Sequence, residues 1–210
     1  MLYALVDDLK KGFSQGLPGQ QAQYKMVPPG RERTKLENIS YTNPKKAAVL
    51  VLVYPKKNVP HIVLMRRNKY PGVHSDQISF PGGKLEEFDS SLEQAAIRES
   101  NEELGILSNQ VEIIGELTQV YIPPSNFMVY PFLGIAKQQL QFIKQDSEVE
   151  DIIEVTLADF LNENNVINTK VATSYNVKVE VPAFKLNGHI VWGATAMMLS
   201  EIKVLLKEVL

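Results

Sequence analysis

Apolar residues recur along the chain with two periods, one of two residues and one of three to four. The β-branched runs at 47–54 and 61–65 flank a polar turn, so we expect a hairpin at the start of the folded core. Similar short runs predict further strands, at 77–80, 111–122, 128–136, 151–155, 171–175, 177–181 and 184–192. The last three form a late hairpin, and residues 157–162 fit one short helical turn.

Helices are expected at three places. Residues 1–16 and 194–210 carry apolar stripes with helical spacing, and the first of these helices is amphipathic. Between them, Ser90 and Glu93 form a capping box that starts a helix of about 14 residues, and Gly105 after Leu104 ends it. Together the elements predict an α+β fold, a sandwich in which a mixed β-sheet lies between helices.

The chain length of 210 residues suits one well-buried core. Residues 16–35 are rich in Gly, Pro and Gln and show no apolar period, so we interpret them as a connecting arm. We therefore expect an N-terminal helix and arm over residues 1–35 and one main domain over residues 36–210.

Composition narrows the classes of function. Apolar residues make up 44% of the chain, charged residues 22%, and the net charge is −2, which favours a soluble globular protein without a basic surface for nucleic acid or membranes. The absence of cysteine excludes disulfides, thiolate metal sites and thiol nucleophiles. No apolar run approaches the ~20 residues of a membrane span, and Asp7 and Asp8 interrupt the first stripe, unlike a signal peptide. We expect a cytoplasmic protein with a small-molecule partner, no nucleic-acid partner and no membrane partner, and we leave a homodimer open.

The central helix carries acidic residues on its apolar side. One narrow face holds Leu92, Ala95, Ala96, Glu99 and Glu103, with Glu102 at its edge. Carboxylates one turn apart repel each other, and partial burial strengthens the repulsion to about several kcal/mol. Arg98 can pair with Glu102 but points away from this face, so a divalent cation best explains the pattern, and all-oxygen ligation favours Mg²⁺ or Mn²⁺. The alternative, a solvated acidic helix end, leaves the preceding Gly-Gly turn unexplained.

The segment 80–106 closely resembles the Nudix box, in which Gly, an acidic residue, Arg-Glu, Glu-Glu, Gly and apolar residues recur at fixed spacing. The matching residues are Gly83, Arg98-Glu99, Glu102-Glu103 and Gly105-Ile106. Three features differ. The interval from Gly83 to Arg98 is one residue longer, the loop acid is Asp89 or Glu86, and Ser100 stands at an apolar position.

The resemblance implies a Nudix-type α/β/α sandwich and a metal-dependent diphosphatase. It implies that Glu99, Glu102 and Glu103 bind Mg²⁺ or Mn²⁺, that the Gly83 or Gly82 carbonyl adds a ligand, and that Arg98 orients the glutamates. Such metal ions bridge diphosphate oxygens and ionise a water.

A remote carboxylate commonly completes such a site, and Glu148 and Glu150 are its candidates. The alternative interpretation is that both residues belong to a solvated acidic loop with Asp146 and Asp151. The residue that activates the water is left open among Glu103, Glu148 and Glu150.

Outside the box, the chain looks like the coenzyme A pyrophosphatase branch. The similar segments are His74, 77–84, 124–127, 131–132, 148–149 and 190–196. That branch cleaves coenzyme A and its thioesters to 3′,5′-ADP and 4′-phosphopantetheine or its acyl form. Upstream the match is partial, because Asp76 stands where a glycine is usual and Lys69 stands near an expected arginine.

Substrate-binding candidates surround the glycine turn. They are Arg66, Arg67, His74, Gly82, Gly83 and Lys84. The cations, with Lys69, could grip the extra phosphate of coenzyme A by charge-assisted bonds, or be ordinary surface residues at strand ends. Trp192 could stack on adenine or pack the last helix against the sheet.

Three hypotheses about function follow. The first is hydrolysis of coenzyme A or acyl-coenzyme A, and the second is hydrolysis of another nucleoside diphosphate derivative, such as ADP-ribose or a dinucleotide. The third is a ligand sensor without catalysis, which the intact Arg98, Glu99, Glu102 and Glu103 argue against.

Overall fold

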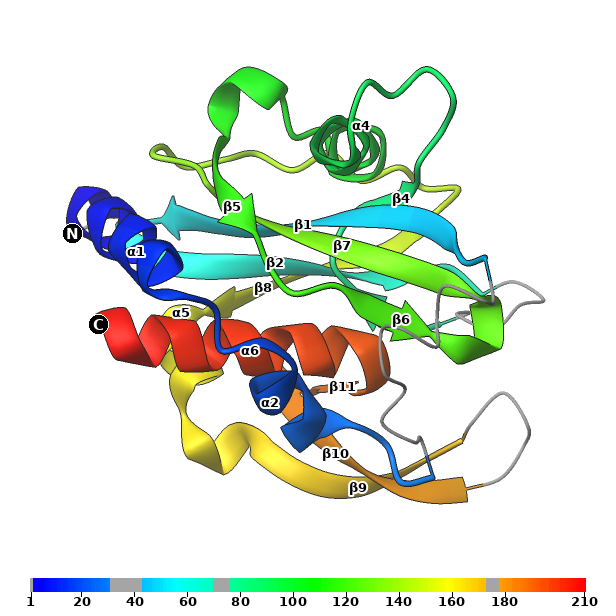
Figure 1. The fold of residues 1–210 in the computed structure, drawn as a ribbon. Helices are drawn as coiled ribbons and strands as arrows, with labels where there is room; N and C mark the ends of the chain where they lie inside the picture. Colours follow the sequence, from blue (N-terminus) through cyan, green and yellow to red (C-terminus); the bar gives the residue numbers. More distant parts are fainter. Residues whose placement is uncertain (1, 31–42, 70–75, 173–177) are drawn as a thin grey trace.

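The structure, a computed structural model, describes residues 2–30, 43–69, 76–172 and 178–210 as a layered α+β fold (Figure 1). Helix α4 (Leu92–Leu104) covers one face of the main β-sheet, and α6 (Gly193–Val209) covers the other. A small second sheet lies beyond α6. The expected sandwich with a mixed sheet between helices is confirmed.

The remaining elements complete these layers. The main sheet contains β1 (Lys45–Lys56), β2 (Val59–Arg67), β3 (Ile78–Ser79), β4 (Gly82–Lys84), β5 (Glu112–Glu116), β6 (Val120–Ile122), β7 (Phe127–Ile135) and β8 (Val149–Thr156). The second sheet contains β9 (Val166–Ala172), β10 (Lys178–Leu186) and β11 (His189–Val191). The other helices are α1 (Leu2–Gln15), α2 (Gly19–Gln23) and α5 (Leu157–Leu161), with 3-10 turns η1 (Tyr24–Met26), η3 (Ser108–Gln110), η4 (Pro123–Ser125) and η5 (Glu163–Asn165).

Strand β1 organises the main sheet. It runs parallel to β7, while its first half pairs antiparallel with β4 and its last residues with β2. Its side chains alternate between two cores: Leu50 and Leu52 lie on the α4 side, and Val51 and Val53 on the α6 side. The pairing of β4 with β1 fixes the Gly-Gly turn directly beneath α4.

The N-terminal segment packs into the α6-side core. Leu5 and Leu9 of α1 are buried in the same apolar cluster as α6, and Phe13 lies against Gly115 of β5. Within the expected arm, the structure instead has the helical turns α2 and η1, and Ser200 of α6 donates to the Ala22 carbonyl of α2 at 2.7 Å. The boundary at residue 35 between the N-terminal segment and the main domain stays a prediction.

Several strand bounds differ from those expected. The strand predicted at 111–122 is interrupted at 117–119, which separates β5 from β6. Strand β9 begins at Val166, earlier than predicted, because it is an edge strand on which the polar residues 168–170 are tolerated. Residues 173–177 of the late hairpin lie outside the described residues.

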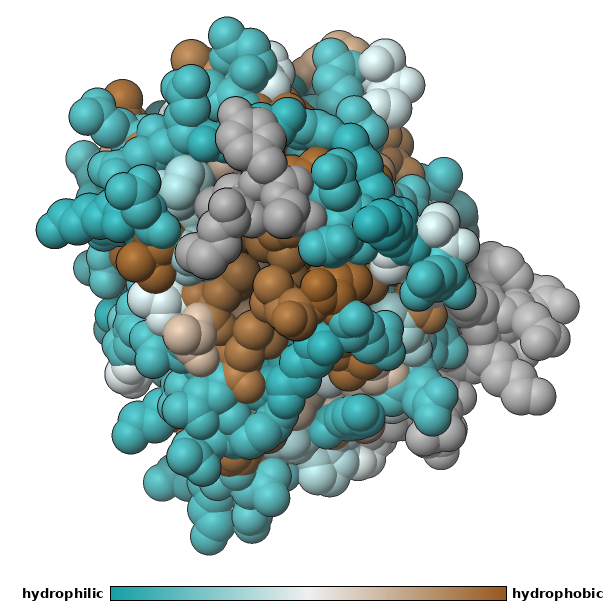
Figure 2. Space-filling model, turned by 90° about the vertical axis from the view of Figure 1, so that its left-hand side faces the viewer, coloured by the Kyte–Doolittle hydropathy of each residue, from teal (hydrophilic) through white to brown (hydrophobic). Residues whose placement is uncertain are grey.

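Figure 2 shows the face on which α1 begins and α6 ends, where hydrophilic residues surround one central apolar area. Within the described ranges, no helix is both long enough and apolar enough to cross a membrane.

Candidate active site on helix α4

Helix α4 lies close to the sheet because small side chains line its inner face. Ala95 and Ala96 are fully buried in the core that α4 shares with β1. Ser100 is also fully buried, and its hydroxyl donates to the Ala96 carbonyl at 2.6 Å. A serine therefore fits where the Nudix box has an apolar residue, because its hydroxyl is satisfied within the helix.

The N-cap of α4 is Ser91, so the prediction of Ser90 was wrong by one residue. The Ser91 hydroxyl accepts from the Gln94 amide at 3.1 Å, and the Gln94 side chain accepts from the Ser90 amide at 2.6 Å. Two adjacent serines each have a Glu or Gln three residues later, and the folded chain uses the second pair. Gly105 ends the helix in the left-handed conformation, with φ 70°, as predicted.

Both glycines before α4 lie in close contact with neighbouring groups. A Cβ on Gly82 would lie 2.3 Å from the Ala48 carbonyl oxygen, and the φ of Gly82 is +147°. A Cβ on Gly83 would lie 2.4 Å from Cδ of Glu99. The Glu99 carboxylate therefore rests directly on the backbone of the turn, where only glycine leaves room.

Glu103 is the most deeply buried acid of the helix. Its side chain is 2% exposed; one carboxylate oxygen accepts from the Gly82 amide at 2.8 Å and the other from Arg67 at 3.4 Å. The pKa of Glu103 is raised to about 8, mainly by burial and also by Glu99 and Glu148, against the opposing effects of Gly82 and Arg67. Burial also raises the pKa of Glu99. Removal from water thus disfavours the charged forms of both carboxylates despite the neighbouring Arg98 and Arg67.

Arg98 ties the loop before α4 to the acidic face. It binds Asp89 through Nε at 2.9 Å and Nη2 at 3.0 Å, and Asp89 in turn accepts from the Glu86 amide at 2.9 Å. Nη1 of Arg98 contacts Glu99 at 2.9 Å and Glu102 at 3.2 Å. The expectation that Arg98 points away from Glu99 was therefore wrong, because its long side chain folds back along the helix. The loop acid that holds Arg98 is Asp89, whereas Glu86 pairs with Lys84.

The two candidate remote acids face different groups. The Glu148 carboxylate is near enough to raise the pKa of both Glu99 and Glu103. Glu150 instead raises the pKa of Arg66. These electrostatic effects favour Glu148 over Glu150 as the partner of the buried pair, and its catalytic role stays a prediction.

The donor chemistry at α4 fits a hard divalent cation, because oxygen is the only ligand type that Glu99, Glu103 and the glycine turn offer. In the parts of the chain that the structure describes, no three acidic or histidine side chains already converge on one point. Glu102 is 58% exposed and lies on Arg98. Holding a metal would thus require Glu102 to turn toward the buried pair.

The cations predicted to bind substrate already have acidic partners. Arg66 binds Asp76 at 2.6 Å, Lys84 binds Glu86 at 3.3 Å, and Arg67 binds Glu103 at 3.4 Å. Asp76 has φ +60°, which explains why a glycine is usual there, and its side chain holds Arg66. His74 lies outside the described residues.

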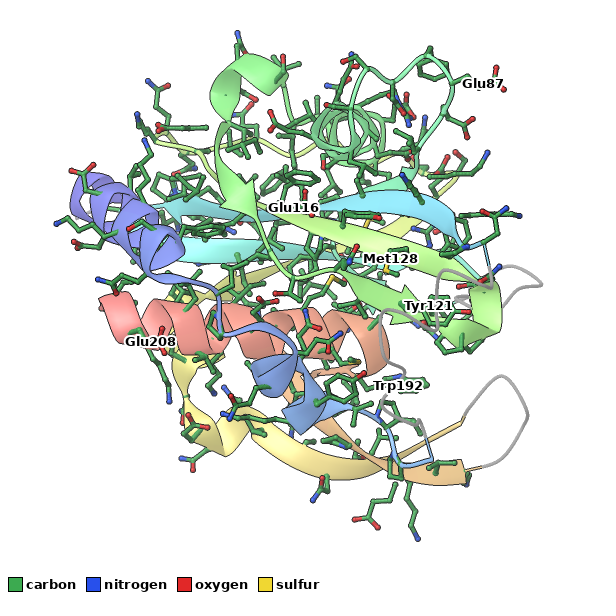
Figure 3. All side chains as sticks on the ribbon, viewed as in Figure 1. Glu87, Glu116, Tyr121, Met128, Trp192 and Glu208 are labelled. Carbon is green, nitrogen blue, oxygen red and sulfur yellow. The ribbon has the colours of Figure 1, made fainter. Side chains whose placement is uncertain are left out.

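Trp192 is the N-cap residue of α6. Figure 3 shows it on the α6 side of the main sheet, across from α4. Beside it, the Thr195 hydroxyl donates to the Ile78 carbonyl at 3.0 Å and fixes the start of α6 to β3. This placement favours packing over a role at α4.

Comparison with known proteins gives concordant matches. Residues 44–174 match the family described as the NUDIX domain. The mitochondrial coenzyme A diphosphatase NUDT8 of Homo sapiens is 31% identical over 157 residues, which cover 74% of this chain and 66%, just under two thirds, of that protein. The uncharacterized Nudix hydrolase NudL of Yersinia pestis is 28% identical over 181 residues, covering 86% and 88% of the two chains.

A solved structure shows the same fold. The MutT/nudix family protein from Enterococcus faecalis superposes with a TM-score of 0.53 at 14% sequence identity, covering 84% of this chain and 71% of that one. The matched residues 44–174 include α4, both glycines and Glu148.

Proposed function

Because the chain belongs to the Nudix family, we propose that it is a metal-dependent diphosphatase that cleaves coenzyme A or an acyl-coenzyme A. The products would be 3′,5′-ADP and 4′-phosphopantetheine or its acyl form. The observation that supports this proposal is the buried pair Glu99 and Glu103. Both carboxylates contact the Gly82–Gly83 turn, and Arg98 contacts Glu99. The name of the human relative and the coenzyme A-like segments support the substrate. A cytoplasmic location and a homodimer stay predictions.

Hydrolysis adds one water across the P–O–P linkage. The water oxygen bonds to one phosphorus, the bridging oxygen leaves with the other phosphoryl group, and one water proton passes to a base. Nudix hydrolases generally need divalent metal ions, and bound Mg²⁺ or Mn²⁺ supplies charge neutralisation and a more acidic water. Glu99, Glu102 and Glu103 would hold the metal, and Glu148 would accept the proton. Arg98 keeps Glu99 oriented through its contact at 2.9 Å.

A second candidate substrate is a nucleoside diphosphate derivative without a 3′-phosphate, such as ADP-ribose. The pairing of Arg66 with Asp76 at 2.6 Å favours it, because a 3′-phosphate would have to displace Asp76 to bind Arg66.

The test is a panel of coenzyme A, dephospho-coenzyme A and ADP-ribose with Mg²⁺ or Mn²⁺, with products identified by mass spectrometry. A charge-assisted contact is worth ~1.5–3 kcal/mol, so dephospho-coenzyme A should have a kcat/KM lower by roughly ten- to a hundredfold. Equal rates would mean that no basic group reads the 3′-phosphate. Faster cleavage of ADP-ribose would favour the second candidate.

Metal dependence has its own control. Glu103→Gln should lower kcat by orders of magnitude while the fold survives, because the amide is neutral and a weaker metal ligand. Glu93→Gln, on the exposed side of the same helix, should leave kcat unchanged. Full activity of the wild type in excess chelator would contradict the metal role.

A further inference from the structure

The segment between β7 and β8 is anchored to the end of α4. The Ile143 amide donates to the Leu104 carbonyl at 2.9 Å, and the Gln145 amide donates to the Glu103 carbonyl at 2.9 Å. Carbonyls in the last turn of a helix lack partners inside it, so this segment satisfies them. The chain then reaches Glu148 through a turn in which the Glu148 amide donates to the Gln145 carbonyl at 3.0 Å.

A bulge follows this turn. On β2, Arg66 pairs with Asp151 and Arg67 with Val149, so Glu150 has no partner in the ladder. A bulge shifts the alternation of side chains by one residue. Val149 consequently points into the α4-side core, and the preceding Glu148 turn is fixed beside α4.

Asn68, the first residue after β2, binds the turn from the other side. Its side-chain Nδ2 donates to the Asp146 carbonyl at 2.8 Å, and its backbone amide donates to the Glu148 carbonyl at 3.0 Å. Lys144 closes the turn internally, because its Nζ donates to the Glu150 carbonyl at 3.1 Å. Asn68 therefore links the Glu148 turn to β2, two residues beyond Arg66 and next to Arg67, which contacts Glu103.

We propose that Asn68 is a positioning residue that holds the Glu148 carboxylate toward the buried pair Glu99 and Glu103. Asn68 itself touches no reacting atom in this scheme. The inference rests on the proposed function, because it assigns Glu148 a part in the diphosphatase reaction. Without the side-chain bond, the turn would sample positions in which Glu148 lies farther from the site.

Two variants and one control test this role. Asn68→Ala removes the bond to Asp146, and Asn68→Asp keeps the size but replaces the donor by a carboxylate that the Asp146 carbonyl repels. Asn165→Ala removes a similar bond, to the Asp159 carbonyl at 2.7 Å, in η5 and serves as the matched control. Amide hydrogen exchange at 145–149 and kcat with the best substrate of the panel are measured for each.

Both Asn68 variants should speed exchange at 145–149 and lower kcat by about three- to tenfold with little change in KM, the factor that one hydrogen bond typically supplies. In a Glu148→Gln background the same substitutions should leave kcat unchanged, because the group that they position is already lost. Asn165→Ala should change neither measurement.

Unchanged exchange in both Asn68 variants would overturn the proposal. So would a kcat loss of the same size in the Glu148→Gln background, since the effect would then bypass Glu148. Absence of any diphosphatase activity in the wild type would instead sink the proposed function, and the exchange measurement would still decide whether Asn68 holds the turn.

Discussion

Gly83→Ala places one methyl group in the space that the Glu99 carboxylate occupies. The added Cβ would lie 2.4 Å from both Cδ and Oε2 of Glu99 and 2.6 Å from Oε1. Non-bonded carbon atoms rest ~3.5–4.0 Å apart, so the carboxylate must retreat by more than ~1 Å. The substitution thus moves a proposed metal ligand without changing its chemistry.

The fold should tolerate this change. Gly83 is not among the described residues with positive φ, so alanine fits the backbone there. The obstacle is the end of a flexible side chain, which can rotate away at little cost. A misplacement of ~1 Å at a reacting centre can lower the rate by about a hundredfold, so we expect kcat to fall by about that factor while the Tm changes little.

Gly115→Ala is the matched control. Its Cβ would lie 2.6 Å from Cε1 of Phe13, a similar overlap, but against an apolar side chain of α1. It should lower the Tm by disturbing the packing of α1 and leave kcat of the folded protein intact. If Gly83→Ala kept wild-type kcat at saturating Mg²⁺, the placement of Glu99 on this turn would have no catalytic consequence, and our reasoning would be refuted.

Two further predictions concern the N-terminal segment. Glu201 is fully buried and accepts four hydrogen bonds from α2 and from Thr118. Glu201→Gln should therefore lower the free energy of unfolding in urea by ~1–3 kcal/mol. An unchanged free energy would contradict this anchoring of α2. Lys10 and Lys137 lower the pKa of Glu112 from 4.5 to about 2, so the ion pairs stabilise the fold above pH 4.5 and that stability is lost as the pH falls toward 2. Glu112→Gln should therefore lower the Tm at pH 7 and not at pH 2, and an equal loss at both would exclude the ion pairs as its cause.

Much of α4 was predictable because local rules determine it. A cap followed by Glu or Gln, a run of small residues and Gly105 fix a helix of nearly the expected length wherever it packs. The burial of Glu103 also followed from the helical period. The choice between Ser90 and Ser91 was not predictable, because both satisfy the same capping pattern.

The partners of the charged residues could not be read from the sequence. Asp89 and Glu86 are both within reach of Arg98 along the chain, and only the folded loop places Asp89 on it. Likewise, the bulge that leaves Glu150 unpaired depends on pairing with a strand some 80 residues earlier, which the local sequence does not reveal. The spacing along the chain identified the acidic residues, whereas the tertiary contacts determine which partner each of them has.

The charges around α4 then decide how a diphosphate can approach. The carboxylates of the site are Asp89, Glu99, Glu102, Glu103 and Glu148, and the guanidinium groups among them are Arg67 and Arg98. Both guanidinium groups are already engaged, Arg98 by Asp89 and Arg67 by Glu103. At an effective dielectric of ~20, a unit charge brought within 4 Å of a like charge costs about 4 kcal/mol. The two guanidinium groups at α4 are therefore not free to compensate an incoming diphosphate, whereas added divalent cations would do so, and these charges support the proposed metal dependence.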